Sequence, residues 1–339
     1  MVSPGRPPSM VDVARLAGVA HVTVSRVLNG ESSVRPATRD RILDAIAELG
    51  YQRNDMARVL KSGRSGMLGV ILAGAELFEL PRVLLGLEQA VTEAGYWMSV
   101  ASWQDGRPEH LDATIDRLLG QAAEGITIIA DRPLALEGLQ RMVARVPVSV
   151  VMSGEVPNAR VGSVELDQDL GGRIVARHLL ALGHREIVHL GGRMGTYDAR
   201  ARAAGWASEL EDFGIRDPEV LIGDFTAASG YQLTNQVLAR RSLPSAIFAG
   251  NDLMAIGALA ALSERGLTVP GDISLVGFDD SPGTDFLVPA LTTVRQDFVE
   301  LGRRSIEVLL ELMNEGLPAH HLLAPTLVER SSTRAVSAA

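Results

Sequence analysis

Hydrophobic residues follow two different spacings along the chain. Up to residue 50 they recur every three or four positions, which predicts short amphipathic helices, and Gly18, Asn29, Gly30 and Gly50 stand where these helices should end. From Met67 onward, short apolar runs alternate with helical patterns. The pattern predicts a small helical head followed by a larger α/β body.

Three short helices are predicted in the head. Ser9 followed by Asp12 matches a capping box, a second helix runs from about His21 to Leu28, and Pro36 suits the first position of a third. Two helices joined by a turn of about four residues that contains glycine form the helix-turn-helix pattern, whose second helix enters the DNA major groove. A small helical hairpin without DNA function has the same spacing, so the pattern alone leaves both interpretations open.

The apolar runs of the body are short and lie between helical patterns, as buried parallel strands do. They cover residues 67–73, 97–102, 125–130, 148–152, 187–190, 246–249 and 273–278. Their alternation with helices predicts parallel sheets covered on both faces. Seven such units fit two doubly wound lobes better than one, with the break between lobes near residues 161–167, after the fourth unit.

Charge is distributed unevenly between head and body. The formal net charge is -9, yet the first 65 residues contain 10 Lys or Arg and 6 Asp or Glu, which leaves 22 and 35 for the rest. The head is therefore +4 and the body -13. A basic head fits contact with nucleic-acid phosphates, and it equally fits a solvated charged surface.

Composition excludes several classes of protein. The absence of cysteine excludes a disulfide framework and cysteine metal sites. No apolar run reaches the roughly 18 residues that a membrane span needs, and the first residues lack the apolar core of a signal peptide. We therefore expect a cytoplasmic protein without a membrane partner.

No residue pattern indicates an enzyme. His184 and His189 flank a predicted strand, but no cysteine or suitably spaced carboxylate completes a metal site, so we expect structural roles for both. The glycine-rich run 191–195 follows a strand yet lacks the spacing of a phosphate-binding loop. We expect neither catalysis nor a metal or other cofactor.

Several motifs, in order, resemble the LacI/GalR family of bacterial transcription regulators. They are VDVARLAGVAHVTVSRVLNG at 11–30 with Thr38, Arg39 and 57–61, then LGHREIVHLGG, ARARAAGW, AGNDLMAIGALAAL, DISLVGFDD and LTTVRQDF. The resemblance covers nearly the whole chain. It implies an α/β fold in which a helix-turn-helix three-helix headpiece and a hinge helix precede two doubly wound parallel-sheet lobes, like those of periplasmic sugar-binding proteins.

The resemblance implies a transcriptional repressor. Its affinity for pseudo-palindromic operator DNA would be controlled allosterically by a small molecule, usually a sugar in this family, bound between the core lobes. The implied domains are a headpiece at 1–52, a hinge helix and linker at 53–66, a core at 67–330 and a flexible tail at 331–339. Within the core, the first lobe should comprise 67–163 and 295–324, and the second lobe 164–294 and 325–332.

The second helix carries the expected base contacts. His21, Val22 and Arg26 fall on one side of it, and the resemblance implies that they read base edges. Arg26 can bond to O6 and N7 of a guanine, whereas Val22 can offer only an apolar contact, such as one to a thymine methyl. Before the helix, Ala20 stands where the family usually has a capping hydroxyl residue. The other DNA contacts expected here are Thr23 and Ser25, toward phosphates, and Asn29.

Residues 54–61 can form two helical turns. The resemblance implies that such hinge helices from two subunits lie in the minor groove, where a leucine wedges a base step and kinks the duplex. Leu60 occupies that position, Ala57 lies near the same face, and Lys61, the only lysine in the chain, follows. A helix this short is marginal alone, so we expect it to order only when two copies meet on DNA.

Two predicted strands end in polar clusters, where ligands bind in doubly wound sheets. We expect Asn251 and Asp279 to contact an effector, whereas Asp252 should cap the following helix and Asp280 should face solvent. The resemblance adds Arg202, the second arginine of ARARAAGW. Carboxylate, amide and guanidinium together suit the hydroxyls of a sugar.

Two aromatic residues are further candidates for the effector site. Phe225 stands where a family member has tryptophan, and its ring can either stack on a sugar or belong to the core. Phe298 matches an aromatic near the crossover between lobes. The stretch AGAELFELP at 73–81 and the pair Met152 and Ser153 depart from the family pattern, so the resemblance does not specify the sugar.

Assembly and an alternative function follow from the same features. Reading a two-fold operator requires two headpieces, so the core should form a homodimer. The residues after Arg330 contain no leucine heptad of the kind that forms tetramers, so we expect a dimer. The competing function is a sugar-binding protein of the transport-receptor type. Such a protein would share the core but would carry an export signal and lack the headpiece.

Overall fold

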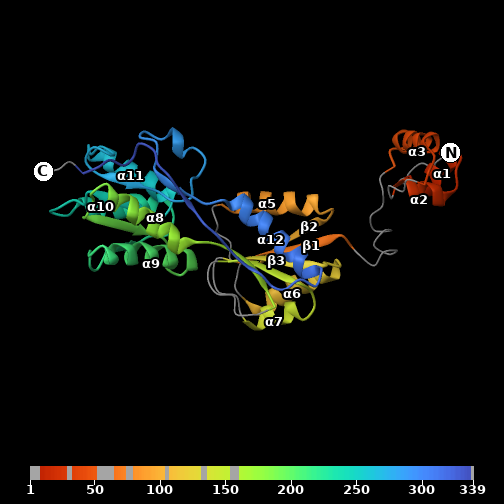
Figure 1. Cartoon of the computed structure of the whole chain (residues 1–339), viewed down its shortest axis with the longest axis horizontal. Coiled ribbons are helices and arrows are strands. Elements are labelled where there is room, and N and C mark those ends of the chain that lie inside the picture. Colours follow the sequence, from red (N-terminus) through yellow and green to blue (C-terminus); the bar gives the residue numbers. More distant parts are fainter. Residues whose placement is uncertain are drawn as a thin grey trace. The chain divides into compact units, whose positions relative to one another are not determined.

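The computed structural model describes residues 8–28, 33–51, 65–73, 79–103, 107–130, 136–152 and 160–336. The chain divides into two compact units, Met1–Ser65 and Gly66–Ala339 (Figure 1). The first unit is the predicted headpiece, and the second is the predicted α/β core.

The headpiece contains three helices at the predicted positions: α1 (Met10–Ala17), α2 (His21–Leu28) and α3 (Pro36–Leu49). The predicted capping box is confirmed, because the Ser9 N–H donates to Asp12 Oδ2 at 2.9 Å. Gly18 ends α1 with a φ of 65°, a left-handed conformation that glycine adopts without a Cβ penalty. One apolar core joins the helices, formed by Val13, Ala14, Ala17, Val24, Val27, Ile42, Ala45 and Tyr51.

The first sheet of the core has six strands, all parallel, in the order β11-β5-β4-β3-β1-β2. They are β1 (Met67–Ala73), β2 (Trp97–Trp103), β3 (Gly125–Ala130), β4 (Val148–Val151), β5 (Gly162–Leu166) and β11 (His320–Leu323). Helices α5 (Leu80–Glu93) and α12 (Phe298–Met313) cover one face, and α6 (Pro108–Gly120) and α7 (Leu136–Val143) cover the other. Both faces are therefore buried, as predicted for a doubly wound lobe.

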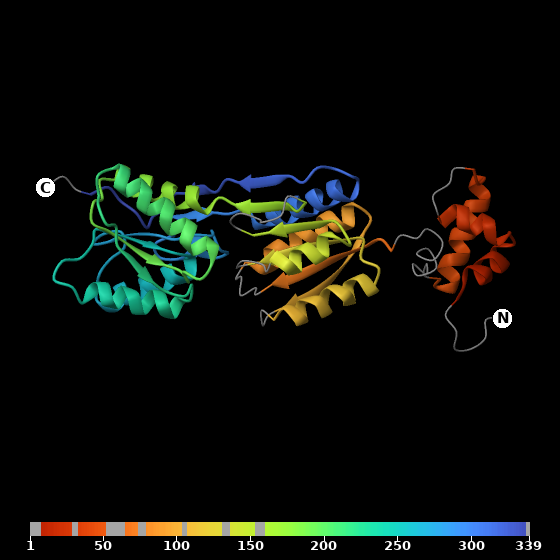
Figure 2. The same cartoon turned by 90° about the horizontal axis from the view of Figure 1, so that it is seen from below.

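The second sheet has four parallel strands in the order β7-β6-β8-β9. They are β6 (Ile187–Gly191), β7 (Val220–Ile222), β8 (Ala246–Ala249) and β9 (Ser274–Val276). Helices α8 (Gln168–Ala181) and α9 (Tyr197–Asp212) lie on one face, and α10 (Ala227–Leu238) and α11 (Asp252–Glu264) lie on the other. Figure 2 shows the two sheets as separate groups within the core.

Two glycines bring α8 and α9 into close contact. A Cβ at Gly172 would clash with the carbonyl of Arg202, and one at Gly205 would clash with the backbone of Asp169. The close approach fixes Arg202 of α9 beside Gln168, the first residue of α8. It thus positions a predicted effector residue.

Three segments connect the two lobes. The chain crosses after β5, after β10 (Thr293–Arg295) and before β12 (Thr326–Val328). Strands β10 and β12 pair antiparallel as a separate two-stranded sheet. Because all of β5 belongs to the first sheet, the first crossing comes after Leu166 rather than between residues 163 and 164 as expected. The short helix η1 (Thr284–Phe286) lies between β9 and β10.

The expectation of a flexible tail from residue 331 is wrong for residues 331–336. Leu275 of β9 donates its N–H to Ser332 O at 2.8 Å, and its carbonyl accepts from Ser332 Oγ at 2.6 Å. Arg334 N–H donates to Ser274 Oγ, and Val336 N–H donates to Leu182 O. Small polar residues indicated a loose end, but their hydroxyl and backbone groups bond to the edge of the second sheet. Residues 337–339 lie outside the described part of the chain.

Candidate functional site

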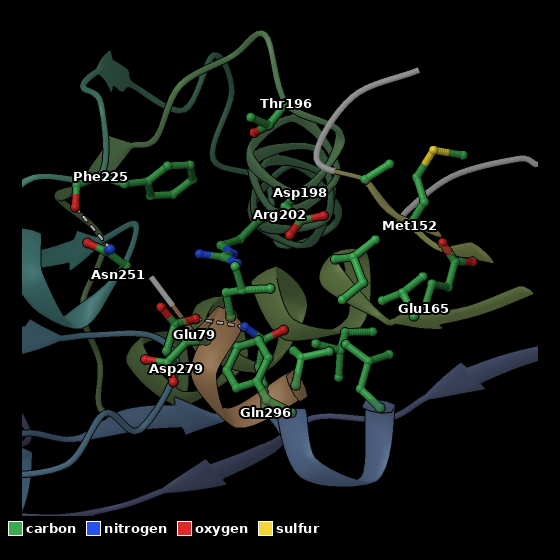
Figure 3. A pocket seen from close by; sticks show the side chains of 18 of the residues that line it. Glu79, Met152, Glu165, Thr196, Asp198, Arg202, Phe225, Asn251, Asp279 and Gln296 are labelled. Carbon is green, nitrogen blue, oxygen red and sulfur yellow. Dashed lines mark hydrogen bonds between the residues drawn. The ribbon is translucent and has the colours of Figure 1, made fainter. Parts of the chain in front are cut away.

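A cavity of about 680 Å³ lies at the carboxyl ends of the strands, where residues of both lobes meet. Such a position is the usual ligand site in open α/β sheets. All five residues predicted to bind an effector line it: Arg202, Phe225, Asn251, Asp279 and Phe298. Figure 3 shows four of them on one side of the cavity, opposite Met152 and Glu165.

Arg202 is buried in the cavity wall and bonded to the protein. Its Nε and Nη2 donate to Gln168 Oε1 at 3.2 and 2.7 Å, and its Nη1 donates to Gly250 O. The guanidinium carbon lies 3.6 Å from the centre of the Phe278 ring. Burial lowers the pKa of Arg202, and the charge of Asp279 opposes this shift.

A chain of side-chain hydrogen bonds connects Arg202 with Asp279. Gln168 accepts from Arg202 and donates from Nε2 to Gln296 Oε1 at 2.8 Å, and Gln296 Nε2 donates to Asp279 Oδ1 at 2.7 Å. Burial raises the pKa of Asp279 well above its ordinary value, whereas the charge of Arg202 acts to lower it. The two glutamines stand at crossings between the lobes, so the chain of bonds spans the connection.

Asn251 lines the cavity but uses its amide within the protein. Its Oδ1 caps α11 by accepting from Met254 N–H at 2.9 Å, and its Nδ2 donates to Phe225 O at 3.0 Å. Phe225 has a φ of 69°, which is unusual for a bulky residue, and its ring lies over Gly192, where a Cβ would clash with it. Asn251 therefore holds Phe225 in place.

Phe298 belongs both to the cavity and to the core of the first lobe. It is the first residue of α12, it packs in the cluster between that helix and the sheet, and the Arg82 guanidinium carbon lies 5.2 Å from its ring centre. Its neighbours complete an apolar wall of the cavity. This wall comprises Leu80, Pro81, Val83, Ile129, Ala130, Val151, Met152, Leu166 and Leu301.

Two expectations for neighbouring carboxylates are wrong. Asn251, not Asp252, caps α11. Asp252 is buried and accepts from Thr293 Oγ1 and from Ser281 N–H, both at 2.7 Å, and burial raises its pKa to about 6. Asp280 does not face solvent, because it pairs with Arg295 and Arg330, each at 2.7 Å. The loop after β9 folds back onto β10, which local sequence does not reveal.

Sequence reasoning missed several polar residues of the cavity. Glu165 lies on the short strand β5, which was not predicted, and Asp198 lies in the first turn of α9, where an acidic residue is ordinary. The missed polar residues are Glu79, Glu165, Arg193, Thr196, Asp198, Asp224, Thr226 and Gln296. Gln168, outside the cavity lining, was missed for the same reason as Asp198, because it is the first residue of a helix.

Helix α2 is packed into the headpiece on one side and exposed on the other. Val24 and Val27 are buried in the headpiece, whereas His21, Val22 and Arg26 are exposed. Thr23 and Ser25 are partly exposed. The remaining candidates lie outside the described residues: Asn29, Ala57, Leu60 and Lys61.

The two histidines of LGHREIVHLGG are bonded within the fold. His184 bonds through Nδ1 to Ser245 Oγ at 2.9 Å and through Nε2 to Arg334 O at 3.0 Å. The His189 ring stacks on Phe248 with 4.1 Å between centres. In the described part of the chain, no group of His, Asp and Glu side chains is arranged to hold a metal ion.

A headpiece that presents an exposed helix, joined to a two-sheet core around a cavity, defines the class of regulators that couple helix-turn-helix DNA binding to a binding-protein-like core. Residues 9–54 match the model of "Bacterial regulatory proteins, lacI family", and residues 176–333 match the "Periplasmic binding protein-like domain". The chain belongs to the LacI family.

Relatives match almost the whole chain. The lactose operon repressor of Escherichia coli (strain K12) is 34% identical over 335 residues, which are 97% of this chain and 92% of the relative. The transcriptional repressor PurR of Haemophilus influenzae (strain PittEE) is 30% identical over 332 residues, 96% of this chain and 98% of the relative.

Solved structures give the same result. The Lac repressor bound to ONPG has a TM-score of 0.84 at 33% identity, and the match covers 97% of this chain and all of the other. The CelR–cellobiose complex has a TM-score of 0.71 at 30% identity, covering 96% and 99%. Among the helices that the structure describes, none is long and apolar enough to cross a membrane.

Proposed function

We propose that the protein is a transcriptional repressor that binds pseudo-palindromic operator DNA through α2 and releases it when a sugar occupies the cavity between the lobes. The exposed row His21, Val22 and Arg26, on a helix whose other side is packed into the headpiece, carries the DNA-binding part. The cavity supports the sensing part, because its apolar wall and polar side chains suit a sugar.

Base recognition is assigned to three side chains. Arg26 reads a guanine through O6 and N7, Val22 contacts a thymine methyl, and His21 adds a further base-edge contact. Thr23 and Ser25 contact phosphates, which orients the helix without reading sequence. Four residues beyond the described part complete the interface: Asn29 after α2, then Ala57, Leu60 and Lys61 in the hinge, with Leu60 as the minor-groove wedge.

The core forms a homodimer in this proposal. Several apolar side chains are exposed on α5, on the edge strand β2, on α11 and on the loop after β9: Leu85, Trp97, Val100, Ile256, Phe286 and Val288. Phe286 and Val288 are 83% and 95% exposed. Helices α5 and α11 lie along the same side of the core (Figure 1), so a second copy can cover residues of both lobes at once.

The regulatory role also implies where in the cell the protein acts and what its cavity does with a ligand. A regulator of bacterial transcription acts in the cytoplasm, where the chromosome lies, and its cavity binds its ligand without converting it. The competing function is that of a sugar-binding protein of the transport-receptor type. Such a protein would not need a headpiece with an exposed arginine on α2. Operator binding by the full chain separates the two functions.

The test of DNA reading replaces Arg26. Operator sites are selected from a random DNA library with the full-length protein, and affinities are measured for every single base-pair change in the selected site. We expect Arg26→Ala to relax discrimination at one symmetric base-pair position, at a cost of about 1–3 kcal/mol.

The matched control is Arg41→Ala, which removes the same charge from an exposed position of α3. It should leave the pattern of base preferences unchanged. If Arg26→Ala weakens binding equally at all sequences, Arg26 contacts a phosphate and the proposed base contact is wrong.

A further inference from the structure

Several hydrogen-bond donors of the effector cavity are committed to the protein. Arg202 donates to Gln168 and Gly250, Gln296 donates to Asp279, and Asn251 donates to the carbonyl of Phe225. These three side chains direct donor groups to the protein rather than to a ligand.

The Asp198 carboxylate, unlike these donors, is not used in a hydrogen bond within the described residues. It lines the cavity beside Arg202 (Figure 3), and Arg202, one helical turn along α9, donates elsewhere. Asp279 adds a second carboxyl group, of which Gln296 occupies only Oδ1. Asp198 therefore offers a charged acceptor to whatever occupies the cavity.

The opposite wall contributes another carboxylate. Glu165 of β5 faces the cavity from the first lobe, and His320 Nε2 lies 3.1 Å from its Oε1. His320 is in turn held by Ser163, whose Oγ lies 2.6 Å from its Nδ1. Acceptors from both lobes thus surround the space, and the lining contains five carboxylates but only two guanidiniums.

The N-terminus of α9 is less favourable to anions than an uncapped helix start. A helix N-terminus attracts phosphate through its free N–H groups and its dipole. Here the Thr196 Oγ1 accepts from Ala199 N–H at 3.3 Å, and the Asp198 carboxylate places a negative charge in the first turn. A phosphate at this end of the cavity would meet the Asp198 carboxylate beside the Arg193 guanidinium.

We propose that Asp198 is a specificity-determining residue of the effector site, which accepts hydrogen bonds from hydroxyl or amino groups of a neutral or amino sugar and excludes phosphorylated and carboxylated sugars. This inference rests on the proposed sensing function. It narrows the ligand class beyond sugars in general.

The test compares the full-length protein with Asp198→Asn, which keeps the shape and removes the charge. The probes are two matched sets: glucose, glucosamine, glucose 6-phosphate and gluconate, and galactose, galactosamine, galactose 6-phosphate and galactonate. Binding is measured by calorimetry and by release of a selected operator. The control is Asp212→Asn at the other end of α9, whose side chain is 75% exposed.

In the wild type we expect neutral or amino members to bind and their phosphorylated and carboxylated counterparts not to bind. Asp198→Asn should weaken binding of those ligands on the order of tenfold and improve binding of the anionic ones, whereas Asp212→Asn should behave as wild type. The inference is wrong if an anionic member binds the wild type more tightly than its neutral counterpart, or if no probe distinguishes Asp198→Asn from the wild type. Operator release by an anionic sugar would overturn this inference alone, whereas failure to bind any operator would overturn the proposed function.

Discussion

At the scale of single residues, the region behind Arg202 combines charge with deep burial. His189 is 1% exposed, its ring lies between Phe248 and Trp206, and Nδ1 bonds to Phe248 O at 3.0 Å. Burial lowers the pKa of His189 to about 3, and the charge of Arg202 acts in the same direction. The folded core therefore keeps this histidine neutral across the whole range near neutral pH.

This histidine should make the core sensitive to acid. The unfolded chain protonates His189 near its ordinary pKa of 6.5, but the folded chain does so only near 3. The part of the free energy of unfolding that depends on His189 protonation is complete above pH 6.5. It is lost as the pH falls toward 3, by up to about 1.4 kcal/mol per pH unit. In His189→Gln the free energy of unfolding should fall less steeply between pH 6.5 and 4.5. Denaturant unfolding at several pH values measures this slope.

The control is His110→Gln, which removes an exposed histidine from the same core. Equal slopes in wild type and His189→Gln would show that His189 is protonated in the folded core as easily as in the unfolded chain.

Single residues also mark the limit of sequence reasoning. Arg202 and Asp279 were predicted because recognisable motifs contain them. Gln168 and Asp198 stand at helix starts, where polar residues are ordinary. Only the packing of α8 on α9 and the crossing between lobes bring them to Arg202 and the cavity. When a side chain interacts with residues that are distant along the chain, the local sequence shows no pattern that predicts the interaction.

At the scale of elements, the strength of the hydrophobic signal decided what could be predicted. The seven predicted strands are present, and their neighbouring helices bury both faces of each sheet. The five missed strands are three to five residues long: β5, β7, β10, β11 and β12. Polar residues such as Glu165, Arg295 and His320 interrupt several of these runs, so the runs are not continuously apolar. The missed strands include those that flank the crossings between lobes.

The segment after β12 should contribute to the stability of the second lobe. Ser332 is fully buried, and its hydroxyl accepts from Thr292 N–H at 2.7 Å and donates to Leu275 O at 2.6 Å. Ser332→Ala leaves both backbone groups without this partner, so we expect a loss of about 1–3 kcal/mol in the free energy of unfolding. Chemical denaturation of the full-length protein measures it.

The neighbouring serine is a matched control. Ser331 is exposed, and Ser331→Ala should change the free energy of unfolding little. Equal stability of the two variants would mean that residues 331–336 add nothing to the second lobe.

At the scale of the whole molecule, function depends on communication between the core and the headpiece. A ligand changes DNA affinity only if it binds one arrangement of the lobes better than another. A ligand in the cavity would contact both lobes, because the apolar wall comes from the first lobe and Arg202 and Asp279 come from the second. The bonds through Gln168 and Gln296 place the crossings between lobes in direct contact with Arg202 and Asp279, which are proposed to bind the ligand.

The coupling itself is tested most directly by operator affinity with and without an effector sugar, measured in parallel for the wild type and Asp279→Asn. The sugar is the probe that binds the wild-type cavity in calorimetry. We predict that the sugar lowers the operator affinity of the wild type, whereas Asp279→Asn binds the operator as tightly as the unliganded wild type and does not respond. Loss of operator binding together with the response in Asp279→Asn, or an unchanged wild-type affinity with the sugar bound, would contradict the account.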